Sequence, residues 1–161
     1  MEKFAVFRVA NDVFGIAIND VVEIIKGQKV FSIPGLPRFL SGVMSVRGAV
    51  IPLMDMRRRF GVEPSGEKER ILIVRFEGEK IGFLVDEMKE ILSLLPDEVS
   101  APPALFRGFR TEYITGLGRK DGSIIILLNI ENLLTSEEKI QLKESLGMIE
   151  EKGAGVRETA E

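Results

Sequence analysis

The chain has 161 residues, of which 45% are hydrophobic, and carries a formal net charge of −3. This length can bury the core of one domain or of two small subdomains, while the negative charge disfavours a general nucleic-acid binder. The sequence has no cysteine and no histidine, which excludes disulfides, thiolate or imidazole metal ligands and the commonest general base. No apolar run approaches the roughly 18 residues of a membrane span, and the N-terminus lacks a signal-peptide pattern. We therefore expect a cytoplasmic protein with no cofactor, no metal ion and no direct membrane insertion.

The first 60 residues are predicted to form short strands. Residues 4–9 and 13–18 have strand-like alternation around a turn signal, and residues 21–25 are apolar except for Glu23. Residues 27–38 are rich in proline and glycine and are predicted to be a loop. Residues 39–60 then indicate a strand, a tight turn, a second strand and a short basic helical turn.

Arg47 and Gly48 mark that tight turn, since glycine permits the positive φ that a hairpin requires. Pro52 interrupts the apolar run of the following strand. Because proline has no N–H to donate to a sheet, it predicts an edge position or a bulge.

The second half of the chain repeats the first. Residues 7–25 match residues 74–92 at a constant offset of 67, and residues 39–55 match residues 113–129 at an offset of 74. A longer, proline-containing loop over 93–110 accommodates the difference, and the polar stretch 62–69 separates the copies. Repeated short strands with turns predict two similar small β-barrels packed in tandem.

We expect barrel one over about 1–66 and barrel two over about 67–134, each completed by some exchange of segments. Thr135 and Glu138 form a capping-box pattern, and Leu142, Leu146 and Ile149 share one helical face. This predicts a C-terminal helix over about 135–150. The polar residues 151–161 are predicted to be a disordered tail.

An ordered series of motifs over about residues 4–135 resembles the CheW family. No single motif is specific to this family, but the complete series in this order is. In the first copy the series runs Phe14-Gly15-Ile16, Val22-Glu23-Ile24-Ile25, Ile33-Pro34, Phe39-Leu40-Ser41-Gly42-Val43, Arg47-Gly48, Val50-Ile51-Pro52-Leu53-Met54-Asp55 and Phe60-Gly61. In the second it runs Val74-Arg75-Phe76, Gly82-Phe83-Leu84-Val85-Asp86 and Leu127-Leu128-Asn129-Ile130.

The resemblance implies two SH3-like five-stranded β-barrels and a bacterial chemotaxis adaptor without enzymatic activity. Such an adaptor couples the cytoplasmic tips of methyl-accepting chemotaxis receptors to the regulatory domain of the CheA histidine kinase. Ser45, where the family usually has asparagine, Met56 and the triple arginine 57–59 depart from the family pattern. A related protein that scaffolds a motility or surface-sensing kinase pathway therefore stays open as an alternative.

The predicted partner-binding residues gather around one charged pair. Glu23 lies within an apolar segment, and Arg47, an arginine that the second copy lacks, is its natural partner. The resemblance implies that this pair faces a partner; the simpler interpretation is a solvated ion pair. Gly42 predicts a backbone requirement at a bulge or close approach, and a side chain there could also block a partner.

An apolar groove between the barrels is the second predicted feature, and a receptor helix could lay its apolar face there. The groove residues, together with Asp86 of the matched motif, complete the predicted partner-binding set: Val21, Val43, Val85, Asp86 and Met88. Each apolar residue, taken singly, fits a core position better than a groove position.

Other functions receive less support from the sequence. The arginines 57–59 fit a solvated helical turn or a contact with an acidic patch on the kinase better than nucleic acid or anionic lipid. The acid pairs Asp20 with Glu23 and Asp86 with Glu87 have no nucleophile or histidine nearby, so we predict no catalytic site. A tandem-barrel module that binds a ligand or nucleic acid would need a basic face rich in aromatics, and the chain has one Tyr and no Trp.

Overall fold

The structure is a computed structural model that describes residues 1–63, 69–102 and 111–147. Its strands are β1 (Glu2–Val9), β2 (Asp12–Ala17), β3 (Val21–Lys26), β4 (Gly42–Val46), β5 (Ala49–Asp55), β6 (Arg70–Phe76), β7 (Glu79–Val85), β8 (Glu87–Leu94), β9 (Val99–Ser100), β10 (Ile114–Lys120) and β11 (Ser123–Leu128). The helical elements are η1 (Ile18–Asp20), α1 (Met56–Arg59), η2 (Pro96–Glu98), η4 (Thr111–Tyr113), η5 (Ile130–Asn132) and a C-terminal helix over 136–147.

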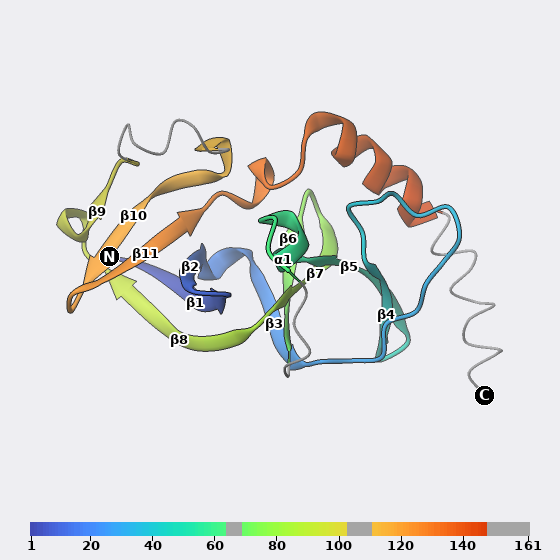
Figure 1. The fold of residues 1–161 in the computed structure, drawn as a ribbon, viewed down its shortest axis with the longest axis horizontal. Helices are drawn as coiled ribbons and strands as arrows, with labels where there is room; N and C mark the ends of the chain where they lie inside the picture. Colours follow the sequence, from blue (N-terminus) through green and yellow to red (C-terminus); the bar gives the residue numbers. More distant parts are fainter. Residues whose placement is uncertain (64–68, 103–110, 148–161) are drawn as a thin grey trace.

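The strands form two sheets, which define two lobes that lie side by side (Figure 1). The six-stranded lobe has the order β8-β1-β2-β11-β10-β9, and the five-stranded lobe has the order β3-β6-β7-β5-β4. The additional strand of the first sheet is the two-residue β9. The predicted fold class, mainly β with two β units, short helices and a C-terminal helix, is confirmed.

Each repeat places its first hairpin in the lobe built by the other repeat. The β1–β2 hairpin pairs with β8 on one side and, in parallel, with β11 on the other. The β6–β7 hairpin pairs with β3 on one side and, in parallel, with β5 on the other. A cut at the polar stretch 62–69 would therefore divide both sheets.

Tight two-residue turns connect the antiparallel hairpins. In the β4–β5 turn, Arg47 and Gly48 have φ values of 48° and 83°, which fits the type I′ turn whose twist matches that of the strands. The turns at Glu77-Gly78 and Asp121-Gly122 repeat the pattern of positive φ at both residues.

Alternation along the strands divides the core into layers. On β6, Ile71 and Ile73 pack inside the five-stranded lobe, whereas Leu72 and Val74 belong to a larger cluster shared with the other sheet. Phe4, Val6 and Leu94 lie in the interior cluster of the six-stranded lobe. Because the shared cluster contains residues of both sheets, the lobes are joined by a continuous apolar core.

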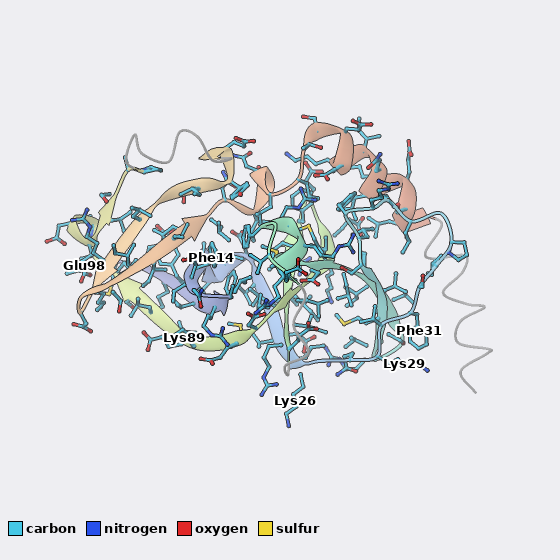
Figure 2. All side chains as sticks on the ribbon, viewed as in Figure 1. Phe14, Lys26, Lys29, Phe31, Lys89 and Glu98 are labelled. Atoms are coloured by element: carbon cyan, nitrogen blue, oxygen red, sulfur yellow. The ribbon has the colours of Figure 1, made fainter. Side chains whose placement is uncertain are left out.

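Phe14 on β2 of the six-stranded lobe belongs to this shared cluster (Figure 2). Its ring stacks on Phe7 and, at 4.6 Å between ring centroids, on Phe60 just after α1. Phe60 in turn approaches Tyr113 of η4. Aromatic rings from β1, β2, η4 and the residue after α1 therefore pack across the junction of the lobes.

The C-terminal helix runs from the end of β11 toward the five-stranded lobe (Figure 1). The Glu138 N–H donates to the Thr135 hydroxyl at 3.1 Å and the Thr135 N–H donates to the Glu138 carboxylate at 2.9 Å, which confirms the predicted capping box. Leu142 is buried in the shared core and Leu146 packs against it, as predicted. The predicted end of the helix at 150, Ile149 and the predicted tail over 151–161 lie outside the described residues.

Candidate functional site

Glu23 and Arg47 form the predicted ion pair, with an Arg47 Nη2 group donating to Glu23 Oε1. Glu23 follows a register shift on β3, and Arg47 occupies the β4–β5 turn. Strands β3 and β4 are the two edges of the five-stranded sheet. The pair therefore connects opposite edges of one sheet, which is the geometry of a sheet curled into a barrel.

The two side chains of this pair differ in exposure. The Arg47 side chain is 71% exposed and the Glu23 side chain 29%. An ion pair this accessible contributes only about 0–1 kcal/mol to stability. Its main physical consequence is to orient the Arg47 guanidinium, which has further N–H donors, at the surface.

Gly42 has a backbone reason to be glycine. Its φ is 154°, and a Cβ added there would lie 2.6 Å from the Phe31 carbonyl oxygen. Phe31 pairs with Val43 through two backbone hydrogen bonds, so that oxygen has little freedom to move. Gly116, the equivalent residue of the second repeat, meets the Ser100 carbonyl oxygen in the same way, at 2.8 Å.

Four of the predicted contact residues, Gly42, Val43, Val85 and Asp86, are buried. Val43 packs with Ile33, and Val85 lies in the core shared by the lobes. The side chains of Val43, Val85 and Asp86 thus offer almost no surface to a partner in this structure, and their role in partner binding stays a prediction. Val21 and Met88 are half-buried and pack against the shared core, so each keeps some accessible surface.

Asp86 is the centre of a charged network at the passage from β7 to β8. Arg57 of α1 forms two hydrogen bonds with its carboxylate, at 2.8 and 2.6 Å. The Ala10 N–H donates to Asp86 Oδ2 at 2.7 Å, and the Arg8 guanidinium lies 3.6 Å from the same oxygen. The network connects the β1–β2 hairpin of one lobe to α1 of the other.

The Asp86 side chain is only 2% exposed. Burial by itself raises the pKa of this carboxyl, but the hydrogen bonds from Arg57 and the Ala10 N–H and the charges of Arg57 and Arg8 outweigh it and lower the pKa. Asp86 is therefore ionised at neutral pH and has a structural role between the lobes.

The sequence interpretation of Arg57 and Arg59 as solvated residues is wrong, since their side chains are only 15% and 10% exposed. Successive residues of a helix project about 100° apart. Met56 of the same turn is buried, and Arg57 and Arg59 project only about 100° and 60° from it around the helix axis, whereas Arg58 projects almost opposite to it. The burial of Met56 therefore brings Arg57 and Arg59 toward the protein interior and leaves Arg58 exposed. Arg8 of β1, which was not among the predicted site residues, also contributes to the charged network, 3.6 Å from Asp86.

Among the described residues, the helices are too short or too polar to cross a bilayer.

Comparison with known proteins identifies the family of this fold. A family model described as the CheW-like domain matches residues 3–138. The chemotaxis protein CheW of Klebsiella aerogenes is 33% identical over 139 residues, covering 85% of this chain and 84% of that protein. The CheW of Treponema pallidum is 30% identical, with 84% of each chain covered.

The crystal structure of the scaffolding protein TtCheW from Thermoanaerobacter tengcongensis has a similar fold, with a TM-score of 0.74 and 31% sequence identity. The similarity covers 82% of this chain and 91% of that one. The chain belongs to the CheW-like family of chemotaxis scaffold proteins.

Proposed function

We propose that this protein is a non-enzymatic, cytoplasmic adaptor that couples methyl-accepting chemotaxis receptors to the CheA histidine kinase. The observation that carries the proposal is the family match, which extends over residues 3–138 and includes relatives named as chemotaxis proteins. The accessible Glu23–Arg47 pair supports it, because a mostly exposed arginine held at a sheet edge is suited to contact with another protein.

In this proposal Arg47 and Glu23 contact the kinase regulatory domain or the receptor tip. Val21 and Met88 supply apolar surface near the junction of the lobes, where an amphipathic receptor helix can lie. The buried residues act from beneath: Gly42 and Val43 fix the β4 edge, and Val85 and Asp86 fix the passage between the lobes.

Coupling also sets a thermodynamic requirement. An adaptor changes the kinase only if it contacts two kinase states differently, since a binder with equal affinity for both shifts neither. Each interface can then be modest in area, because an array with many copies adds avidity.

Co-sedimentation tests the proposal with the full chain, a purified receptor tip and a purified kinase regulatory domain, each partner alone. The wild type should be retained by both. Arg47→Glu should lose at least one partner, whereas Arg119→Glu, which alters an exposed arginine of β10 in the other lobe, should lose neither. Absence of wild-type binding to both partners would refute the adaptor role.

A further inference from the structure

A second charged surface lies away from the Glu23–Arg47 pair. It is a cavity of about 370 Å³ lined by Arg38, Phe39, Arg58, Arg59, Gly61 and Glu138. We call it the arginine pocket. The lining residues come from the loop before β4, from α1 and the residues after it, and from the first turn of the C-terminal helix.

The three arginines of α1, a single helical turn, project in different directions. Arg57 reaches inward to Asp86, as described above. Arg59 lies against the Phe39 ring, 5.9 Å from its centroid, and forms two hydrogen bonds with Glu138, at 3.2 and 2.9 Å. Arg58 remains exposed, and its Nη2 group donates to the Arg38 carbonyl oxygen at 2.9 Å.

Glu138, the acidic residue of the pocket, already accepts hydrogen bonds from other groups of the protein. Besides Arg59, its carboxylate accepts from the Thr135 N–H at 2.9 Å. Burial raises the pKa of Glu138, but the hydrogen bonds from Arg59 and Thr135 outweigh that effect and lower the pKa, so the carboxylate is ionised at neutral pH. It neutralises Arg59 and holds the pocket wall in place.

Arg38 and Arg58 keep their positive charges available. Within the described part of the chain, neither guanidinium forms an ion pair. Three arginines and one ionised glutamate leave a charge of +2 around the pocket, in a chain whose formal net charge is −3. A local excess of positive charge against the sign of the whole molecule is a feature that attracts a compact anion.

We infer that the arginine pocket binds two neighbouring carboxylates of an acidic segment on a partner protein. This inference rests on the proposed adaptor function, in which the partners are proteins. Guanidinium groups match carboxylates through paired N–H donors, and Arg58 retains such donors after its one bond to Arg38. The small cavity volume and the acidic net charge of the chain disfavour a long polyanion such as nucleic acid.

A direct test follows backbone amide NMR signals of the full 15N-labelled chain during titration with the peptide acetyl-Glu-Glu-Glu-Glu-amide. We expect saturable shifts at Arg38, Arg58 and Gly61 that weaken as sodium chloride rises. The peptide acetyl-Gln-Gln-Gln-Gln-amide should give none. The double variant Arg38→Gln/Arg58→Gln should abolish the shifts.

The control variant Arg75→Gln/Arg119→Gln removes the same charge from two exposed arginines outside the pocket and should keep the response. Shifts spread over all exposed arginines, or a response to inorganic phosphate at these amides without one to the glutamate peptide, would overturn the inference.

The partner test separates this inference from the adaptor proposal. If the wild type binds the kinase regulatory domain or the receptor tip, Arg38→Gln/Arg58→Gln should weaken binding of one of them roughly fivefold or more. Unchanged affinity for both would refute the inference and leave the adaptor role intact. If the wild type binds neither, the adaptor role fails and with it the protein partner that this inference names.

Discussion

Arg47 occupies a backbone conformation that costs a side chain free energy. Its φ of 48° lies in the left-handed region, where a residue with a Cβ is less stable than glycine by roughly 1 kcal/mol. The Glu23–Arg47 pair, whose arginine is mostly exposed, returns about the same amount at best. Glu77 and Asp121 occupy the equivalent turn position with similar φ values, so the backbone conformation does not distinguish Arg47 from them. The features that distinguish Arg47 are its positive charge and its exposed side chain.

Arg47→Glu is expected to leave the melting temperature within a few degrees of wild type, because it removes a weak surface pair and adds one exposed repulsion with Glu23. Partner binding should be lost. Differential scanning calorimetry and the co-sedimentation assay measure the two quantities. A collapsed melt with binding intact would contradict the recognition role.

Two further variants separate charge from backbone strain. Arg47→Asn keeps a residue that tolerates positive φ and removes the charge, so it should also lose binding. The exchange Glu23→Arg with Arg47→Glu restores an ion pair with reversed polarity. If binding returned in that double variant, the pair would matter only for local structure.

Asp86→Asn tests the buried network at the passage from β7 to β8. Asparagine keeps the shape but removes the buried negative charge that accepts two hydrogen bonds from the mostly buried Arg57 side chain, which costs about 3 kcal/mol or more. Urea unfolding followed by circular dichroism measures this loss. Glu87→Gln, a neighbouring change at an exposed side chain 3.7 Å from Arg8, should cost less than about 0.5 kcal/mol; equal costs would refute the structural role of Asp86.

Part of this residue-level arrangement could be predicted and part could not. A single glutamate in an apolar strand requires a partner or solvent, so its pairing with Arg47 was foreseeable. A core position for Val85 was the expectation for that residue taken singly, but the sequence could not decide between the core and the predicted groove, because all residues from Ile81 to Val85 are buried and this part of the strand is apolar on both faces. Alternation then distinguishes two faces but cannot tell which one, if either, meets solvent.

At the scale of the elements, the internal repeat predicted the similarity of the two β units and the pattern of their strands. The offset of 67 places β1–β2 on β6–β7, and the offset of 74 places β4–β5 on β10–β11. The repeat could not assign each hairpin to a lobe. Because the two hairpins are alike, each offers similar edges to either set of strands, and only the packing of the junction selects between them.

Thr135→Ala tests whether the capping box positions the C-terminal helix. It removes the hydroxyl that accepts the Glu138 N–H and should reduce the free energy of unfolding by about 1 kcal/mol. Chemical unfolding measures the difference, and Ser136→Ala, one residue further on and exposed, is the matched control. An equal effect of both variants would show that the cap is not the cause.

The whole molecule should have a free energy of unfolding that peaks at mildly acidic pH. Asp86 and Glu138 have folded pKa values below the ordinary ones, despite burial, because of their hydrogen bonds to arginine and backbone groups. Their stabilisation is fully present above the unfolded pKa of about 4 and is lost as pH falls through the folded values. This gives the acid limb of the curve.

Asp20 and Glu69 act in the opposite sense. Burial first, and then repulsion from Glu131 for Asp20 and from Asp55 and Asp86 for Glu69, raises their pKa values. A carboxyl whose pKa is raised on folding destabilises the fold at neutral pH, and this cost disappears as pH falls through the raised value.

Urea unfolding between pH 3 and pH 7 should therefore show stability rising from pH 7 toward the maximum and falling below about pH 4. Asp20→Asn should stabilise the protein at pH 7 and flatten the neutral limb. A curve that falls steadily from pH 7 to pH 3, in wild type and variant alike, would contradict this assignment.

The exchange of hairpins makes the two lobes dependent on each other, and fragments can test it. A chain of residues 1–66 contains β1–β2 without β8 and β11, and β3–β5 without β6–β7. Each sheet then lacks the strands that close its hydrogen bonds, and the shared core loses Leu72, Val74 and Phe83. Since the buried area per residue falls steeply in so small a fragment, we expect residues 1–66 and 67–161 each to be unfolded alone, with collapsed amide dispersion in NMR spectra.

Mixing the two fragments should restore the dispersed spectrum of the intact chain, because all strand pairings then become available. A folded 1–66 fragment would show that the first repeat closes on itself, and the exchanged topology would have to be abandoned.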